Sequence, residues 1–186
     1  METLVEGAVE EALRDGRGEA VRLYVAACAE RMAPLFVGLR GVPGREADLD
    51  LYVESLSGLW LADRPIADAA ERVRLLERFP ELQPDEEGIA GVADTYAFFA
   101  ALCLRHALLA HNSGNADDAV SCGHAALTAM GMLDESVAGA SLLADEQRLR
   151  SLSLSGDAAG LWDASVTAGR ERLRAVVGRL PRWSSS

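Results

Sequence analysis

Apolar residues recur every three to four positions along almost the whole chain of 186 residues. This spacing places them on one face of an α-helix, whereas a half-buried β-strand alternates apolar and polar residues. Apolar residues make up 49% of the sequence and aromatic residues only 5%. Alanine and leucine, both strong helix formers, supply most of the apolar side chains. The sequence therefore predicts an all-α fold.

Glycines and prolines divide this pattern into separate helices. The segments with a clear helical pattern are 17–39, 49–60, 65–79, 85–111, 115–130 and 161–180, and the fifth begins at Asn115 or at Asp117. A shorter acidic helix is expected within 3–13, and the segment 134–155 stays unassigned because its pattern is weak. We predict a single-domain bundle of six or seven helices over 17–181. A short acidic segment, 1–16, precedes it and a mobile tail, 182–186, follows it.

The segment 85–111 differs from the other predicted helices. It is apolar on nearly every side from Tyr96 to Ala110. A helix of this kind is normally buried, so we predict that 85–111 is the central helix of the bundle. The apolar run is about five residues too short for a membrane span and contains Arg105 and His106, so no membrane partner is expected.

The net charge is −11, from 29 acidic and 18 basic residues. The excess lies in residues 1–100, which hold 20 acidic residues and 10 arginines. Such a chain is repelled by nucleic-acid phosphates and by anionic lipid, so neither is expected as a partner. The last predicted helix is an exception, because it carries Arg170, Arg172, Arg174 and Arg179. These arginines could meet the acidic half of the same chain, or that of a second copy, which would be self-association.

The residue types also restrict the chemistry and the compartment. Lysine is absent, which excludes Schiff-base chemistry and a lysine-bearing phosphate loop. The three cysteines, Cys28, Cys103 and Cys122, are odd in number and lack the spacing of a disulfide scaffold. The first residues are acidic and lack the apolar core of a signal peptide. We therefore expect a cytoplasmic protein with free thiols.

One stretch of the chain resembles a known family. It contains the string Cys-x-Glu-Arg-Met-x-Pro at 28–34, then a glycine-bearing turn at 41–44 and a helix that ends in Leu59 and Trp60. This order, with the Ser-Gly turn at 113–114, is similar to the YjaG-like family of bacterial helical proteins of unknown function. The likeness spans 24–133 and departs from the family pattern beyond that. It implies a compact, cytoplasmic helical protein capable of self-association, and it implies no reaction.

Glu30 and Arg31 are the first candidate binding residues. Arg31 flanks the apolar face of its predicted helix, and Glu30 points farther out. Arg31 could be presented to an anionic ligand or to a carboxylate of a partner. The structural alternative, which we favour, is an arginine that lies along the edge of the core and clamps a neighbouring helix through a carboxylate.

Arg105 and His106 are the other candidates, because they interrupt the apolar face of the central helix. His106 could act as a general base, although a single histidine on an apolar helix is more often neutral and structural. Cys103 and His106, one turn apart, are weak candidates for metal ligands. The neighbouring Cys122 and His124 point to opposite sides of a helix and cannot easily share an ion. We expect no metal and no cofactor.

Two classes of function fit these observations. The first is a non-catalytic protein-binding or regulatory module, such as an immunity protein or an antitoxin that neutralises a basic partner. The second is an enzyme or small-ligand binder with an interhelical pocket around His106 and Arg31. A closed core around His106 would favour the first class, and an open cleft that gathers His106, Arg31 and a carboxylate would favour the second.

Overall fold

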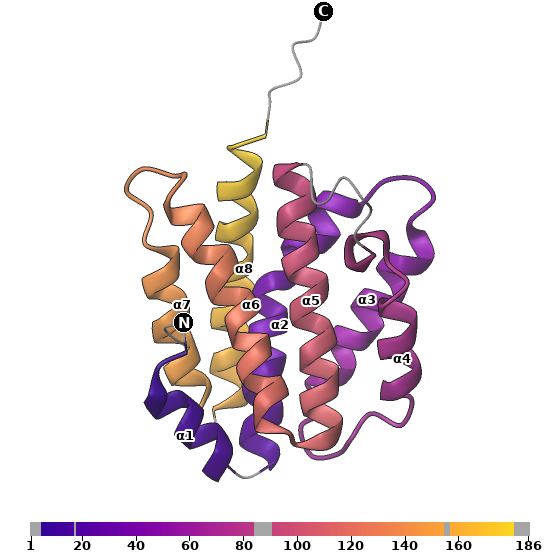
Figure 1. The fold of residues 1–186 in the computed structure, drawn as a ribbon, viewed down its shortest axis with the longest axis vertical. Coiled ribbons are helices and arrows are strands. Elements are labelled where there is room, and N and C mark those ends of the chain that lie inside the picture. The colour runs from indigo at the N-terminus through magenta and orange to yellow at the C-terminus, as the bar shows by residue number, and fades with distance from the viewer. Residues whose placement is uncertain (1–4, 17, 84–90, 155–156, 181–186) are drawn as a thin grey trace, which may run out of the picture.

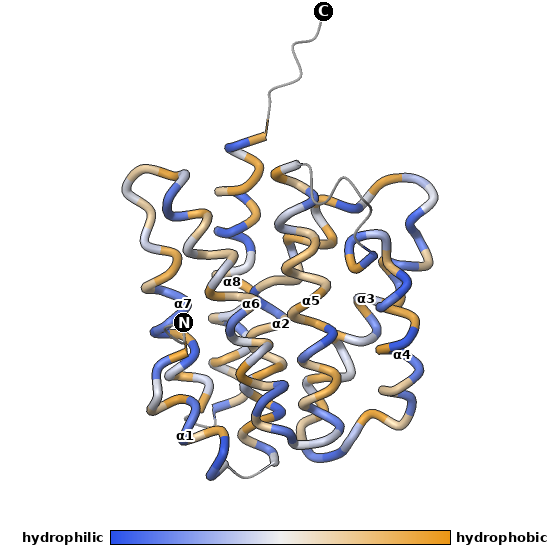
Figure 2. Tube along the Cα trace, in the orientation of Figure 1, coloured by the Kyte–Doolittle hydropathy of each residue, from blue (hydrophilic) through white to orange (hydrophobic). Residues whose placement is uncertain are grey.

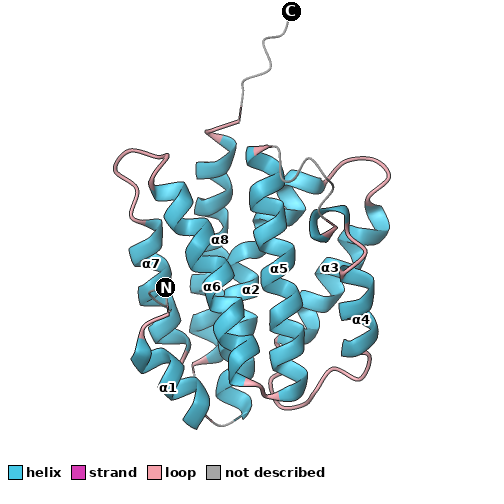
Figure 3. Cartoon of the chain, in the orientation of Figure 1, coloured by secondary structure: helices cyan, strands magenta, loops and turns pink. Residues whose placement is uncertain are grey.

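The protein folds into a bundle of α-helices, in a computed structural model that describes residues 5–16, 18–83, 91–154 and 157–180 (Figure 1). The elements are α1 (Gly7–Asp15), α2 (Gly18–Arg40), α3 (Glu46–Leu59), α4 (Ala69–Leu76), the 3-10 helix η1 (Pro80–Leu82), α5 (Val92–Ser113), α6 (Ala116–Asp134), α7 (Leu142–Ser153) and α8 (Ala158–Val177). No strand occurs in these ranges (Figure 3). The predicted all-α class is confirmed. The predicted count of six or seven is too low, because α7 forms in the unassigned segment.

Helix α2 is the most enclosed element, whereas the sequence assigned the central place to 85–111, which contains α5. More residues of α2 than of α5 are buried. Its residues 23–29 form an unbroken buried stretch, and the helix packs against α3, α5, α6, α7 and α8. Small side chains in this stretch let the neighbouring helices approach closely. Pro34 lies inside α2, and a Cβ added to Gly169 of α8 would meet its ring at 2.9 Å. The α2–α8 crossing therefore requires a glycine at position 169.

Helices α5 and α6 form an antiparallel hairpin in front of α2 (Figure 1). Gly114 ends α5 in the left-handed conformation, with φ of 69°. The Asn115 side chain then caps α6 by accepting a hydrogen bond from the Asp117 N–H at 2.9 Å. This settles the start of the helix that the sequence left between Asn115 and Asp117. The predicted start of the central helix, 85–90, lies outside the described residues, as does the predicted tail, 182–186.

The length of α5 differs from what the sequence predicted, which was an apolar run about five residues too short to span a membrane. Its 22 residues are long and apolar enough to cross a membrane by length and composition alone, although the apolar run read from the sequence is shorter. Within the bundle, 44% of its most apolar window is buried, mainly against α2 and α6. A core helix of a soluble protein has the same properties.

Helices α3 and α4 cover the side of the bundle away from α7 (Figure 1). Few aromatic residues occur in the chain, and three of them gather here. Phe36 of α2 stacks on Tyr52 of α3 at 4.4 Å between ring centroids and on Phe79 at 5.3 Å. The helix predicted to start at Pro65 starts only at Ala69.

Helix α7 lies on the opposite side and is attached differently. Asp134, the last residue of α6, accepts hydrogen bonds from the N–H groups of Leu142 and Leu143, both at 2.9 Å, and so fixes the start of α7. Leu149 is the only apolar residue of α7 that is fully buried. The other buried residues of α7 are Glu146, Arg150 and Ser153. Hydrophilic residues accordingly run along α7 in Figure 2, beside the more apolar α5 and α6.

Candidate functional site

A network of buried charges joins α2, α7 and α8. The Arg31 guanidinium donates two hydrogen bonds to the Glu146 carboxylate, from Nε at 2.8 Å and from Nη2 at 2.9 Å. Arg172 of α8 donates to the same carboxylate. Arg31 also donates to the Ser165 hydroxyl at 3.3 Å. All four side chains are buried, with 0–1% of each residue exposed.

Arg150 forms a second part of this network, one turn after Glu146. Its Nε donates to the Tyr24 hydroxyl at 2.8 Å. Gly123 of α6 makes room for the pair, because a Cβ there would lie 2.3 Å from the Tyr24 oxygen and 3.2 Å from Arg150 Nε. Arg150 Nη2 is buried and has no hydrogen-bond partner among the described residues.

The ionised Glu146 carboxylate in this network holds α7 to its neighbours. Burial alone would raise the pKa of Glu146, but Arg31 and Arg172 lower it to about 2. Glu146 therefore stays ionised at neutral pH. It is the only carboxylate hydrogen-bonded to Arg31 or Arg172 in the part of the chain described. A buried charge that loses its partner is strongly destabilising, so α7 is held in place by Glu146.

Arg31 thus clamps a neighbouring helix through a carboxylate, which is the structural alternative considered from the sequence. Glu30, one residue earlier, accepts a hydrogen bond from Trp60 Nε1 at 2.9 Å, and its partial burial raises its pKa. These two candidate residues therefore face α7 and the end of α3, respectively.

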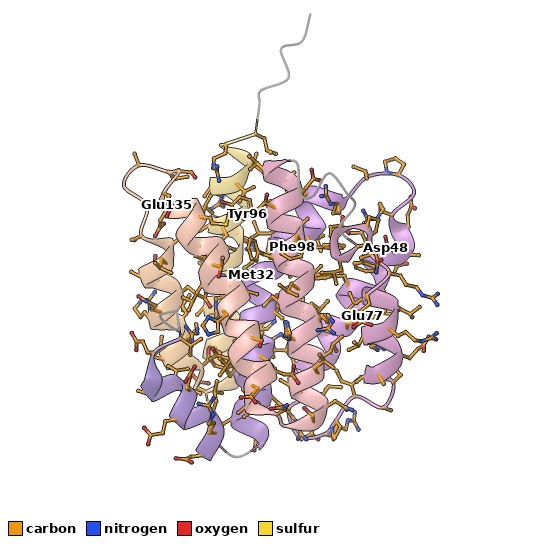
Figure 4. All side chains as sticks on the ribbon, viewed as in Figure 1. Met32, Asp48, Glu77, Tyr96, Phe98 and Glu135 are labelled. Carbon is orange, nitrogen blue, oxygen red and sulfur yellow. The ribbon has the colours of Figure 1, made fainter. Side chains whose placement is uncertain are left out.

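The other two candidates also face separate helices. Arg105 forms an ion pair with Glu77 at 2.7 Å, and Glu77 lies on the α4 side of the bundle (Figure 4). His106 Nδ1 lies 3.5 Å from an oxygen of Asp118 in α6. Burial and Arg105 lower the pKa of His106, so the imidazole is neutral at pH 7. Among the described residues, the four candidates therefore have four different partners, Trp60, Glu146, Glu77 and Asp118.

Two arginines of the segment predicted to self-associate bind side chains within the chain instead. Arg172 is buried in the network with Glu146. Arg179 donates to the Tyr96 hydroxyl at 2.7 Å. Arg170 and Arg174 remain exposed.

The weak metal candidates are likewise separated. Cys103 lies beside Cys122, with 3.4 Å between the sulfur atoms, whereas His106 faces Asp118. Within the described ranges no three His, Cys, Asp or Glu side chains converge on a point where a metal ion could be held.

A groove between α7 and α8 was not foreseen from the sequence. It has a volume of about 410 Å³. Its lining contains Leu149, Leu152, Ala164, Thr167 and Ala168, with Asp145, Arg148, Asp163 and Glu171 around them. Residues next to this lining in the chain, Glu146 and Arg172, belong to the buried network. The sequence offered one signal for it, the small residues at 164, 167 and 168.

The chain was compared with known proteins. No family model, no curated protein and no solved structure matches it. The resemblance to the YjaG-like family therefore remains a prediction, and the function must be argued from the geometry.

Proposed function

We propose that the protein is a non-catalytic, cytoplasmic regulatory module that binds a basic helical segment of a partner protein in the α7–α8 groove. The observation that carries the proposal is the combination of an apolar groove floor with an excess of negative charge around it. An exposed apolar groove with a charged rim is typical of surfaces that hold an amphipathic helix.

The shape of the groove suits a helix. Ala164, Thr167 and Ala168 lie on one face of α8. Their small side chains allow a second backbone to approach closely. On the α7 side the lining runs from Asp145 to Leu152, a length of about 10 Å at 1.5 Å per residue. The groove therefore accommodates about two turns of a partner helix.

The charge of the groove favours a basic occupant. Three carboxylates and one guanidinium line it. Arg148 is paired with Asp145 at 3.7 Å, and neither Asp163 nor Glu171 has an ion-pair partner in the described parts of the chain. The net charge of −11 adds a long-range field of the same sign. Such a field speeds the encounter with a basic partner and disfavours acidic ones.

The buried network that links α7 to α8 supports the same function. Glu146 of α7 and Arg172 of α8 are hydrogen-bonded, so they connect the two helices that form the walls of the groove. Walls held by buried ion pairs keep the groove open without a ligand, and a preformed groove lowers the entropic cost of binding. Neutralisation of a basic partner, as by an immunity protein or an antitoxin, is the kind of regulation that we propose.

The alternative, an enzyme or ligand pocket around Arg31 and His106, has less support. Arg31 is fully buried against Glu146, and His106 lies beside Asp118. A reaction that needs both side chains would require the helices to separate.

Site-specific photo-crosslinking tests the proposal. A photoreactive amino acid at Thr167, an exposed position of the groove, is expected to capture one predominant partner from the lysate of the protein's own cell, through a basic segment. The same group at Ala47 on α3, an exposed residue on the far side of the bundle (Figure 1), should not capture it.

Charge variants of the crosslinking protein provide the matched control. The double change Asp163→Asn and Glu171→Gln should reduce capture about tenfold, because the two unpaired acids of the groove are lost. The double change Glu11→Gln and Asp15→Asn on exposed α1 removes the same charge elsewhere and should leave capture unchanged. Equal capture from Thr167 and Ala47 would refute the proposal. So would equal capture by the groove variant and the α1 variant.

A further inference from the structure

Three cysteines meet in the interior of the bundle, where α2, α5 and α6 pack together. Cys28, Cys103 and Cys122 are free thiols and fully buried. The sulfur atoms of Cys103 and Cys122 are 3.4 Å apart. Cys122 also interacts with Cys28. Cys122 is therefore the middle member of a continuous thiol cluster.

Cys28 differs from the other two because it lies beside a cation. Arg31 Nη2 donates to the Cys28 sulfur at 3.3 Å. Burial raises the pKa of Cys28, but the hydrogen bond with Cys122 and the charge of Arg31 outweigh it and leave the pKa below its ordinary value. Burial instead raises the pKa of Cys122. Arg31 therefore stabilises the thiolate form of Cys28, and the thiolate is the form that reacts with oxidants.

We propose that this cluster is a hydroperoxide-reactive site in which Cys28 reacts first and a disulfide between Cys103 and Cys122 is the final product. In the first step the Cys28 thiolate attacks one oxygen of the hydroperoxide. A sulfur–oxygen bond forms, the oxygen–oxygen bond breaks, and water or an alcohol leaves after it takes up a proton. The sulfur is oxidised to a sulfenic acid and the hydroperoxide is reduced.

In the second step Cys122 attacks the sulfenic sulfur of Cys28. A sulfur–sulfur bond forms, the sulfur–oxygen bond breaks, and the oxygen leaves as water with the Cys122 proton. In the third step Cys103 attacks the Cys122 sulfur and loses its own proton, and Cys28 leaves as a thiolate. Overall, two thiols and one hydroperoxide give one disulfide, one water and one further molecule of water or alcohol.

Arg31 determines the direction of the third step. Thiol–disulfide exchange releases the sulfur that best carries negative charge. Cys28 is that sulfur, because the Arg31 guanidinium is hydrogen-bonded to it. The sulfur atoms of Cys103 and Cys122 must approach by only about 1.4 Å to reach the bond length of about 2.0 Å, a movement that side-chain rotation can supply.

Oxidation of the purified full-length protein with hydrogen peroxide tests the proposal. We expect the intact mass to fall by two hydrogens. Peptide mapping after blocking free thiols should show Cys103 linked to Cys122 and Cys28 alkylated. Dimedone added with denaturant as the reaction is stopped should trap a sulfenic acid on Cys28 of the wild-type protein. Because the three thiols are buried, a bulky aromatic disulfide should react with them far more slowly than hydrogen peroxide does.

Cysteine-to-alanine variants separate the three steps, and circular dichroism checks that each is folded. Cys28→Ala should slow disulfide formation about tenfold, since it removes the thiolate beside Arg31. Cys103→Ala should stop at a disulfide between Cys28 and Cys122, and Cys122→Ala should form none within the chain. The proposal is overturned if peroxide leaves the mass unchanged, if only sulfinic or sulfonic acids form, or if dimedone labels Cys103 or Cys122 instead of Cys28.

Discussion

The two sides of α2 are held to their neighbours by different forces. On one side α5 and α6 contact it through aliphatic side chains and thiols such as Ala97, Leu104 and Cys122. On the other side α7 is anchored mainly by Glu146 and Arg150, which bind side chains of α2. Apolar packing tolerates small shifts, whereas a buried ion pair fixes a single geometry and is costly to break in half. The groove of the proposed function lies on the side fixed by charges.

The largest expected effect comes from removal of the central carboxylate. Glu146→Gln should lower the free energy of unfolding by about 3–5 kcal/mol, because Arg31 and Arg172 would remain buried without their anion. Urea unfolding at pH 7 measures the loss. Glu11→Gln, on the exposed face of α1, is the matched control and should change stability by less than about 0.5 kcal/mol.

The pH dependence of stability distinguishes the loss in Glu146→Gln from the loss caused by a packing defect. The pKa of Glu146, at about 2, lies below its ordinary value of 4.5, which applies in the unfolded chain. The carboxylate therefore stabilises the fold above pH 4.5, and this contribution fades as the pH falls toward 2. The deficit of Glu146→Gln should shrink over that range. Leu104→Ala on the apolar side should cost about 2–5 kcal/mol at both ends of it. An equal pH response of the two variants would contradict the comparison.

Two glycines of α6 allow a sharper test of the polar side. Gly123→Ala should cost about 2–3 kcal/mol in urea unfolding, because the added methyl group would overlap the Tyr24 hydroxyl and crowd Arg150. Gly131→Ala is the matched control in the same helix, since its nearest new neighbour is 4.0 Å away. That change should stabilise the protein by up to about 1 kcal/mol, as alanine normally does in a helix. Similar effects at both positions would show that Tyr24 and Arg150 move easily.

A histidine gives the apolar side its own response to acid. Burial and the charge of Arg22 lower the pKa of His111 to about 4, below its ordinary value of about 6.5. The fold is therefore most stable when His111 is neutral, and this stability is lost as the pH falls from 6.5 toward 4. We expect a loss of about 2 kcal/mol over this interval, measured by urea unfolding. His111→Gln should reduce the loss, and an unchanged slope would show that other groups cause it.

The smallest expected effect concerns an exposed charge pair. Glu71 and Arg74 are hydrogen-bonded on the surface of α4, with about half of each side chain exposed. Glu71→Gln should change stability by less than about 0.5 kcal/mol at pH 7, because solvent screens such pairs. A cost comparable to that of Glu146→Gln would mean that burial is not what separates the two pairs.

The same contrast explains what the sequence could predict. The periodicity of α2, α5 and α6 was clear because their contacts are apolar. Helix α7 was missed because its inward positions carry Glu146, Arg150 and Ser153, which a hydropathy pattern assigns to solvent. Arg31 stood out as an arginine beside an apolar face, but its partner is 115 residues away along the chain. The groove could not be predicted, since it depends on how α7 and α8 lie against each other.

The cap that Asp134 provides to α7 has a practical consequence. Its two oxygens bind the first N–H groups of α7, so both ends of the loop at 135–141 are fixed independently of the loop's length. The entropic cost of a longer loop grows only slowly. An epitope or fluorescent reporter inserted after Gly139, an exposed residue, should therefore be carried outside the bundle while the helices on both sides keep their places.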